Sequence, residues 1–220
     1  MNKSHKPATI RQATIRNGVI LGLFALISTG LIAITHLITK DTIANEIEAA
    51  LARRLNDIVT AAEYDNDVYH DCQLVQSEDL LGSNDFLKVY RMRNQGEDYG
   101  VFMTSIAPDG YAGKITLVIG IYADGQIAGV RVTNHSETPG LGDKIEIEKS
   151  SWIKQFDGLS LANTPESDWL VKKDGGTFDA LTGATITPRA IVKSVYRTLQ
   201  YFSQNREAVF SNSQPCGARS

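Results

Sequence analysis

The amino-acid sequence predicts an α+β protein in which a single N-terminal transmembrane helix precedes a domain that contains an antiparallel sheet. The first observation is an uncharged apolar run at residues 18–38. The second is a series of segments with strand character between residues 86 and 134, two of them joined by a tight-turn dipeptide. The third is an amphipathic pattern from residue 188 onward, which is typical of a helix that packs on a sheet by one face.

Length and charge limit the classes of function. A chain of 220 residues accommodates one soluble domain plus accessory segments. The formal net charge is −3 and the pI is about 5.8, so the chain has no basic surplus for binding nucleic acid. No Ser-His-Asp or paired-carboxylate arrangement suggests hydrolysis, and we therefore predict no catalytic residues of that kind.

Residues 18–38 are predicted to form the transmembrane helix. They contain no Asp, Glu, Lys or Arg, and a helix of this length spans about 30 Å, the thickness of one hydrocarbon core. The preceding residues 1–17 carry no acidic side chain and four basic ones: Lys3, Lys6, Arg11 and Arg16. By the positive-inside rule they stay in the cytoplasm, and everything after Lys40 lies across the membrane. The alternative is a cleaved signal peptide, which has a shorter apolar region and a cleavage site that residues 35–40 lack.

Residues 39–84 are predicted to form an amphipathic helix and a connecting segment. Asp41 is placed to cap this helix. Its apolar positions recur at helical spacing, namely Ile43, Ile47, Leu51, Leu55, Ile58 and Ala62. Residues 64–84 are polar and acidic and contribute loops with at most one short element. Their carboxylates lack the ordered spacing of a calcium loop, so we predict no metal site there.

The two cysteines, Cys72 and Cys216, would lie in an oxidising compartment in this topology. A disulfide between them is chemically allowed, but spacing along the chain does not show whether they are close enough to pair. They are too few for an iron–sulfur or structural zinc site. The sequence leaves a disulfide and two free thiols equally open.

Residues 85–206 are predicted to form the main domain, and residues 207–220 a polar tail. Strands are expected at residues 86–93, 99–107, 114–122 and 126–134. The dipeptide Asp124-Gly125 is expected to close the last hairpin with positive φ at both positions. Residues 135–142 hold a proline and two glycines and should form a compact loop. A short helix at residues 150–156, a strand at 168–172 and a helix at 188–206 follow.

Residues 179–188, Asp-Ala-Leu-Thr-Gly-Ala-Thr-Ile-Thr-Pro, are the most informative stretch. Pro188 suits the first position of a helix, and Thr187 before it is a favourable N-cap residue. The free N–H groups and the positive end of the helix dipole would then point back towards Thr185. Such a corner suits a phosphate group.

Three segments stand in a characteristic order: Gly110-Tyr111-x-Gly113, Glu137-Thr138-Pro139-Gly140-Leu141-Gly142, and Asp179-x-x-Thr182-Gly183-Ala184-Thr185. With the N-terminal anchor they resemble the FMN-binding domain family, and within it the G subunits of the Rnf electron-transport complex, called Rsx in some bacteria. The resemblance covers nearly the whole chain. It places the anchor in the bacterial inner membrane and the domain in the periplasm.

The resemblance implies that a flavin transferase links FMN to Thr185 through a phosphoester bond. Thr182 is then placed to bind phosphate oxygens, while Gly183 and Ala184 leave the loop accessible. Glu137 and Thr138 would meet the ribityl chain or the ring edge, and Leu141 would offer an apolar surface to the ring. Gly142, in the same loop, completes the predicted FMN-binding set.

The function implied is that of an electron carrier within a membrane complex. Such complexes pass electrons between ferredoxin and NAD, coupled to ion movement, or towards a redox-sensing regulator. The partners implied are the other subunits of the complex and the transferase. Two alternatives stay open: the C-type subunit of a sodium-translocating NADH:quinone reductase, which shares the domain, and an assembly subunit without redox function.

Overall fold

The computed structural model describes the backbone of residues 10–211 and of residue 216, and the side chains of these residues except 10–12, 41–45 and 47–52. The chain divides after Leu51 into two compact units, residues 1–51 and 52–220. Helix α1 (Ile10–Asn56) begins in the first unit and ends in the second. Its segment Ala13–Lys40 contains an 18-residue window with a mean hydropathy of 2.2 and is long enough to cross a membrane.

Helix α1 differs from the predicted pair of helices. It continues through Asp41 without interruption, so Asp41 is not an N-cap. The reason is that residues 36–50 contain neither glycine nor proline to break the helix. Of the predicted apolar face, Ile43, Ile47 and Leu51 lie outside the described side chains, Leu55 is fully buried, and Ile58 follows the end of the helix.

The second unit is built on a five-stranded antiparallel sheet in which every strand pairs with its neighbour along the chain, in the order β1-β2-β3-β4-β5. The strands are β1 (Cys72–Ser77), β2 (Ser83–Asn94), β3 (Glu97–Ala107), β4 (Ile115–Tyr122) and β5 (Ile127–Asn134). The four predicted strands are confirmed, as is the fold class. The first strand, with the short helix α2 (Glu78–Leu81) after it, falls in the segment that was predicted as loops.

Strand β1 escaped prediction because its sequence is half polar. Gln73 is almost fully buried, yet its amide group donates a hydrogen bond to the carbonyl oxygen of Ala208, 3.1 Å away. That partner lies 135 residues further along the chain. A buried glutamine is stable only when such a partner is present, and local sequence does not reveal it.

The hairpin between β4 and β5 forms where Asp124-Gly125 predicted it, but with different turn geometry. Gly125 has a φ of +91°, and Gln95 is the one non-glycine residue of the described chain with a positive φ. Asp124 therefore does not adopt positive φ, and that part of the prediction is wrong. Its carboxylate instead accepts the N–H of Gln126 at 2.9 Å, while the N–H of Gly125 bonds the carbonyl of Tyr122. This is a three-residue loop with glycine in the left-handed position.

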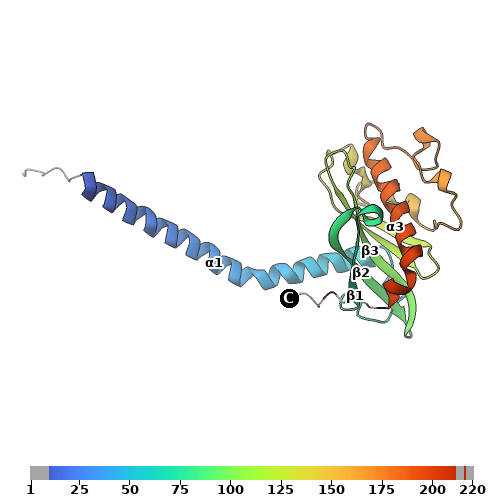
Figure 1. Ribbon diagram of the computed structural model, residues 1–220, viewed down its shortest axis with the longest axis horizontal. Coiled ribbons are helices and arrows are strands. Elements are labelled where there is room, and N and C mark those ends of the chain that lie inside the picture. Colours follow the sequence, from blue (N-terminus) through green and yellow to red (C-terminus); the bar gives the residue numbers. More distant parts are fainter. Residues whose placement is uncertain (1–9, 212–215, 217–220) are drawn as a thin grey trace, which may run out of the picture. The chain divides into compact units, whose positions relative to one another are not determined.

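Helix α3 (Ile186–Phe210) lies across one face of the sheet and supplies much of the core (Figure 1). The apolar positions predicted for this helix are all buried, namely Ile191, Val192, Val195, Leu199 and Phe202. The helix begins two residues before Pro188 and continues four residues past residue 206. The prediction that Thr187 caps the helix is wrong, because Thr187 lies inside the first turn.

Four 3₁₀ turns connect β5 to α3: η1 (Gly142–Ile145), η2 (Ser151–Phe156), η3 (Glu166–Asp168) and η4 (Lys172–Asp174). The short helix predicted at residues 150–156 is confirmed in this tighter form. The strand predicted at residues 168–172 is wrong, since only a single bridge pairs Val171 with Phe178. Trp169 and Val171 are apolar because they are buried in the core, where they anchor an irregular segment.

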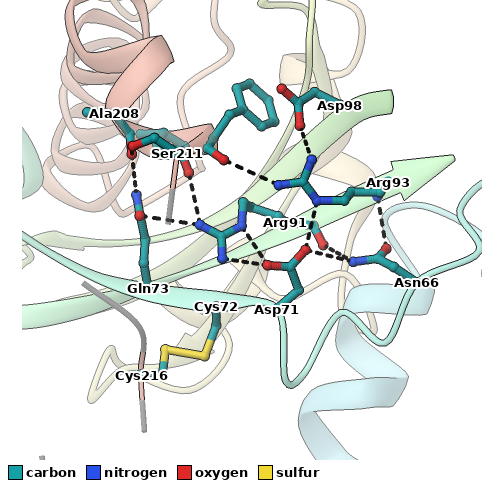
Figure 2. Close-up of polar contacts among 12 residues, drawn as sticks. Asn66, Asp71, Cys72, Gln73, Arg91, Arg93, Asp98, Ala208, Ser211 and Cys216 are labelled. Carbon is teal, nitrogen blue, oxygen red and sulfur yellow. Dashed lines mark hydrogen bonds and ion pairs between the residues drawn. A yellow bond between two sulfur atoms is a disulfide. The ribbon is translucent and has the colours of Figure 1, made fainter. Parts of the chain in front are cut away.

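The C-terminal end of α3 is held by side chains of the sheet (Figure 2). Its last carbonyl groups accept hydrogen bonds from Gln73, Arg91 and Arg93. Asp71 lies between the two arginines and pairs with both. Positive charge at this end is favourable because the helix dipole is negative there.

Cys72 on β1 and Cys216 in the tail form a disulfide, with a Cα–Cα distance of 5.5 Å. Of the two possibilities that the sequence left open, the structure therefore contains the disulfide. The bond ties the tail to the edge strand of the sheet, next to the side chains that hold the end of α3 (Figure 2).

Candidate functional site

The loop at residues 179–185 is fastened at its first residue. The carbonyl of Asp179 accepts the indole N–H of Trp152 at 2.6 Å, and its N–H donates to Gln155 at 2.9 Å. The Asp179 carboxylate pairs with Lys172 at 2.6 Å on the surface. Asp179 therefore fastens its loop to η2 and η4.

Residues 181–184 form a tight turn that exposes its tip. The N–H of Ala184 donates to the carbonyl of Leu181 at 3.0 Å, and Leu181 is buried as the base of the turn. Gly183 has a φ of +80°. The third position of a type II turn requires a positive φ, which residues with a Cβ rarely adopt. Thr182 and Gly183 are both exposed to solvent.

Thr185 occupies the N-cap position of α3, and its hydroxyl makes no capping hydrogen bond. In the described part of the chain, no acceptor pairs with the N–H groups of Thr185, Ile186 or Thr187. The carbonyl of Thr185 accepts the first helical bond, from Arg189 at 3.4 Å. The start of the helix thus lies two residues earlier than predicted, directly after Thr185, and anion binding at its free N–H groups stays a prediction.

Glu137 is the point at which the three segments meet. Its side chain is nearly buried, with 4% of its surface exposed. One carboxylate oxygen accepts the N–H of Ala112 at 3.0 Å, and the other accepts the hydroxyl of Thr187 at 2.6 Å. Two glycines pack closely against the carboxylate. A Cβ on Gly110 would lie 2.9 Å from one of its oxygens, and a Cβ on Gly142 would lie 2.7 Å from the other.

The loop after Glu137 is compact, as predicted. The carbonyl of Thr138 accepts the N–H groups of Leu141 and Gly142, both at 3.1 Å. The loop brings Leu141 against the turn tip, since a Cβ on Gly183 would lie 3.0 Å from Leu141 Cδ2. Leu141 remains 42% exposed and Thr138 is exposed, whereas Gly142 is buried against Glu137.

A second set of polar contacts connects this loop to residues 143–149. The N–H of Glu137 donates to His135 Nδ1 at 2.9 Å, so the ring carries its proton on Nε2, which lies 2.6 Å from Glu146. Lys149 contacts Glu146 and Asp143 at 3.0 and 2.9 Å. Burial raises the pKa of Glu146, but the hydrogen bonds from His135 and Lys149 outweigh it and hold the pKa below its usual range.

Exposed apolar side chains lie next to Thr185. Leu141 and Ile186 are 42% and 46% exposed; Leu141 lies against Gly183, and Ile186 directly follows Thr185. The grooves elsewhere on the domain, of about 320 and 440 Å³, are lined by other residues. A ligand held at Thr185 would therefore lie on an open, partly apolar surface.

The structure thus brings together most of the predicted site residues and adds others. Thr182, Gly183, Ala184 and Thr185 share one turn, and Leu141 touches it. Glu137 and Gly142 lie behind this surface, engaged with protein groups. Sequence reasoning missed the parts played by Thr187 and Ala112, because their contacts with Glu137 join segments 50 and 25 residues apart.

Two family models match the chain: the FMN-binding domain over residues 110–200 and the RnfG N-terminal region over residues 1–58. Proteins named as the G subunit of an ion-translocating oxidoreductase complex are similar over almost their whole length. The one from Pseudoalteromonas atlantica is 45% identical over 94% of this chain and 96% of its own. Those from Vibrio atlanticus and Pseudomonas aeruginosa are 45% and 42% identical, covering 92% and 96% of this chain and 96% and 98% of their own.

Proposed function

Because the chain belongs to the family of G subunits of ion-translocating oxidoreductase complexes, we propose that it is an FMN electron carrier of such a complex, with the flavin linked covalently to Thr185. The observation that carries the attachment site is local. Thr185 combines a hydroxyl that makes no capping bond with N–H groups at the start of α3 that no described residue accepts.

The residues present fit the phosphate end of FMN. The N–H groups of Thr185, Ile186 and Thr187 supply donors that suit an anion, and the helix dipole adds a favourable field. Thr182, exposed on the same turn, adds a hydroxyl. When bound, FMN supplies the one- and two-electron chemistry, and the protein contributes attachment, orientation and electrostatic environment.

The exposed apolar side chains fit the ring end. Leu141 lies against the turn that holds Thr182 and Gly183, so a ring attached through Thr185 has an apolar surface within reach. Both oxygens of Glu137 are occupied by protein donors. We therefore restrict the direct FMN contacts that we propose to Thr185, Thr182, Leu141 and the backbone donors.

Covalent attachment requires a flavin transferase that can reach the threonine. The turn suits such a partner because Thr182 and Gly183 are exposed, and neither Gly183 nor Ala184 has a bulky side chain. The transferase would take the flavin from a donor in which the flavin phosphate is joined to a second phosphate. Thr185 Oγ1 would bond to the flavin phosphorus, the phosphoanhydride bond would break, the second phosphate would leave with the rest of the donor, and the hydroxyl proton would pass to a base or to water. A covalent bond also keeps the flavin beside its redox partners at a fixed local concentration.

We also propose that the second unit lies in the periplasm, on a single anchor in the inner membrane. The four basic residues before the apolar run support this orientation, and the Cys72–Cys216 disulfide fits an oxidising compartment. A periplasm-specific reporter fused after Ser220 should be active, and the mature protein should retain its N-terminus. Activity of a cytoplasmic reporter at the same position would contradict the orientation.

The relatives argue against one of the two alternatives that the sequence left open. Those compared are named as the G subunit and match over nearly their full length, so we set aside the C-type subunit of a quinone reductase. An assembly subunit without flavin remains the competing function. The intact attachment turn and its unpaired donors argue against it.

Flavin fluorescence after denaturing electrophoresis tests the proposal. The chain made together with the transferase should give a fluorescent band, and Thr185→Ala should fold but give none, since alanine has no hydroxyl to esterify. Thr182→Ala is the matched control and should retain the band. Peptide mass mapping should place the flavin on Thr185, and a flavin on Thr182 or Thr187 would refute the assignment.

A further inference from the structure

Thr187 makes a buried contact that phosphate binding does not explain. It lies two residues after Thr185, in the first turn of α3, and none of its surface is exposed. Its hydroxyl donates to Glu137 at 2.6 Å, the short distance typical of a charge-assisted hydrogen bond. The bond joins the helix that begins at the attachment site to the loop that carries Leu141.

The surroundings of Glu137 leave its carboxylate no room for a ligand. The backbone N–H of Ala112 donates a hydrogen bond to the second carboxylate oxygen. A Cβ on Gly142 would lie 2.7 Å from one oxygen, and a Cβ on Gly110 2.9 Å from the other. Both carboxylate oxygens of Glu137 therefore bond protein groups, and these bonds join the Ala112 segment, the Leu141 loop and the start of α3.

We propose that Thr187 and Glu137 are positioning residues, whose hydrogen bond sets the start of α3 against the Leu141 loop and so prepares the surface on which FMN is attached and held. The inference rests on the proposed attachment of FMN to Thr185. Breaking the bond leaves a buried carboxylate oxygen without its donor. The loop and the helix start can then shift relative to each other, and the Leu141–Gly183 contact loosens.

A purely structural role for Thr187 is the competing explanation, and the same helix offers a matched control. Thr198 is also fully buried, and its hydroxyl lies 2.8 Å from Ser105 Oγ and 2.8 Å from the carbonyl of Ser194. It lies eleven residues further along α3, about three helical turns from Thr187. Valine at either position removes one buried hydroxyl and nearly preserves the volume.

The test uses the full-length chain made together with the flavin transferase, as wild type, Thr187→Val, Thr198→Val and Thr187→Ser. Three quantities are measured: the thermal midpoint, the initial rate of covalent flavin incorporation, and the reduction potential and fluorescence anisotropy of the bound flavin. We expect both valine variants to lower the thermal midpoint by a similar amount. Only Thr187→Val should slow incorporation, by at least fivefold, and lower the anisotropy. Thr187→Ser, which keeps the hydroxyl, should stay within twofold of wild type.

Wild-type incorporation, anisotropy and potential in Thr187→Val would overturn the positioning role, as would an equal loss in Thr198→Val. If Thr187→Val does not accumulate as folded protein, Thr187→Ala replaces it with the same expected outcomes, because alanine also removes the donor without placing a methyl group against the carboxylate. Absence of covalent flavin from the wild-type chain would refute the attachment itself, and this result is separate from any difference among the variants.

Discussion

Replacing Arg91 by methionine should strongly destabilise the second unit. Arg91 is completely buried, yet its guanidinium nitrogens lie 2.7 and 2.5 Å from Asp71, 3.3 Å from Gln73 and 3.4 Å from the carbonyl of Val209 (Figure 2). Methionine fills a similar length with no hydrogen-bond donor. The variant therefore leaves a carboxylate, an amide oxygen and a helix carbonyl short of one partner each.

The size of the effect follows from what remains around Asp71. Removing one partner of a buried ion pair costs about 3–5 kcal/mol, because the other charge stays behind unpaired. Asp71 keeps Arg93 at 3.0 Å and Asn66 at 3.2 Å, and a quarter of its side chain is exposed. We therefore expect the lower end of that range, a loss of about 3 kcal/mol in the free energy of unfolding.

Lowering the pH should reduce the difference in the free energy of unfolding between the wild type and Arg91→Met. Burial raises the pKa of Asp71, but the hydrogen bonds from Arg91 and Arg93 outweigh it and hold the pKa below its usual value. A depressed folded-state pKa contributes stability above the unfolded pKa of about 3.9, and this contribution is lost as the pH falls through the folded value. Arg91→Met has less of this stability to lose, so the gap should shrink below about pH 4.

Urea unfolding of the full-length chain in a mild detergent provides the assay. Both tryptophans, Trp152 and Trp169, lie in the second unit, so their fluorescence reports on that unit. The control is Lys193→Met, which breaks an exposed ion pair with Asp109 and should cost at most about 1 kcal/mol. A loss under about 1 kcal/mol in Arg91→Met at neutral pH, or a gap that does not change with acid, would refute this reasoning.

Three further outcomes are expected. Removing the disulfide as Cys72→Ser with Cys216→Ser should cost about 2–5 kcal/mol in urea unfolding, because the bond closes a loop across 144 positions; equal stability of wild type with and without reductant would contradict this. Gly183→Ala should cost about 1–2 kcal/mol and lower the yield of covalent flavin, since its φ is +80°; a normal yield at normal stability would show that the turn tolerates a side chain. Tyr99 should titrate at about 12, chiefly through its hydrogen bond to Glu63, and Glu63→Gln should lower that pKa in a phenolate absorbance titration.

Short-range signals accounted for much of the fold. Strands β2 to β5 were predictable because apolar and β-branched residues recur in them between turn residues. Helix α3 was predictable from the spacing of its buried face, although its first turn was placed two residues late. Pro188 is compatible with several positions in a first turn, and the local sequence does not show that Thr187 lies inside this turn and bonds Glu137.

Long-range partners explain what the sequence did not reveal. Gln73, Arg91 and Asp71 connect the region of strand β1 to the C-terminal end of α3. In the sequence alone, these polar residues are indistinguishable from residues of the surface. The predicted strand at residues 168–172 failed for the opposite reason. Its apolar residues, Trp169 and Val171, are buried by tertiary packing without a strand partner.

The apolar helix, the fold class, the family and the turn before Thr185 could be inferred without the structure, because short motifs of neighbouring residues indicate each of them. The environment of Glu137 could not be inferred in this way. The resemblance implied that this carboxylate meets the ribityl chain or ring edge of the flavin, which stays a prediction, and folding places Ala112, Thr187 and two glycines from three separate segments around it. A buried charge requires several donors at once, and donors that are distant in the chain meet only when the domain folds.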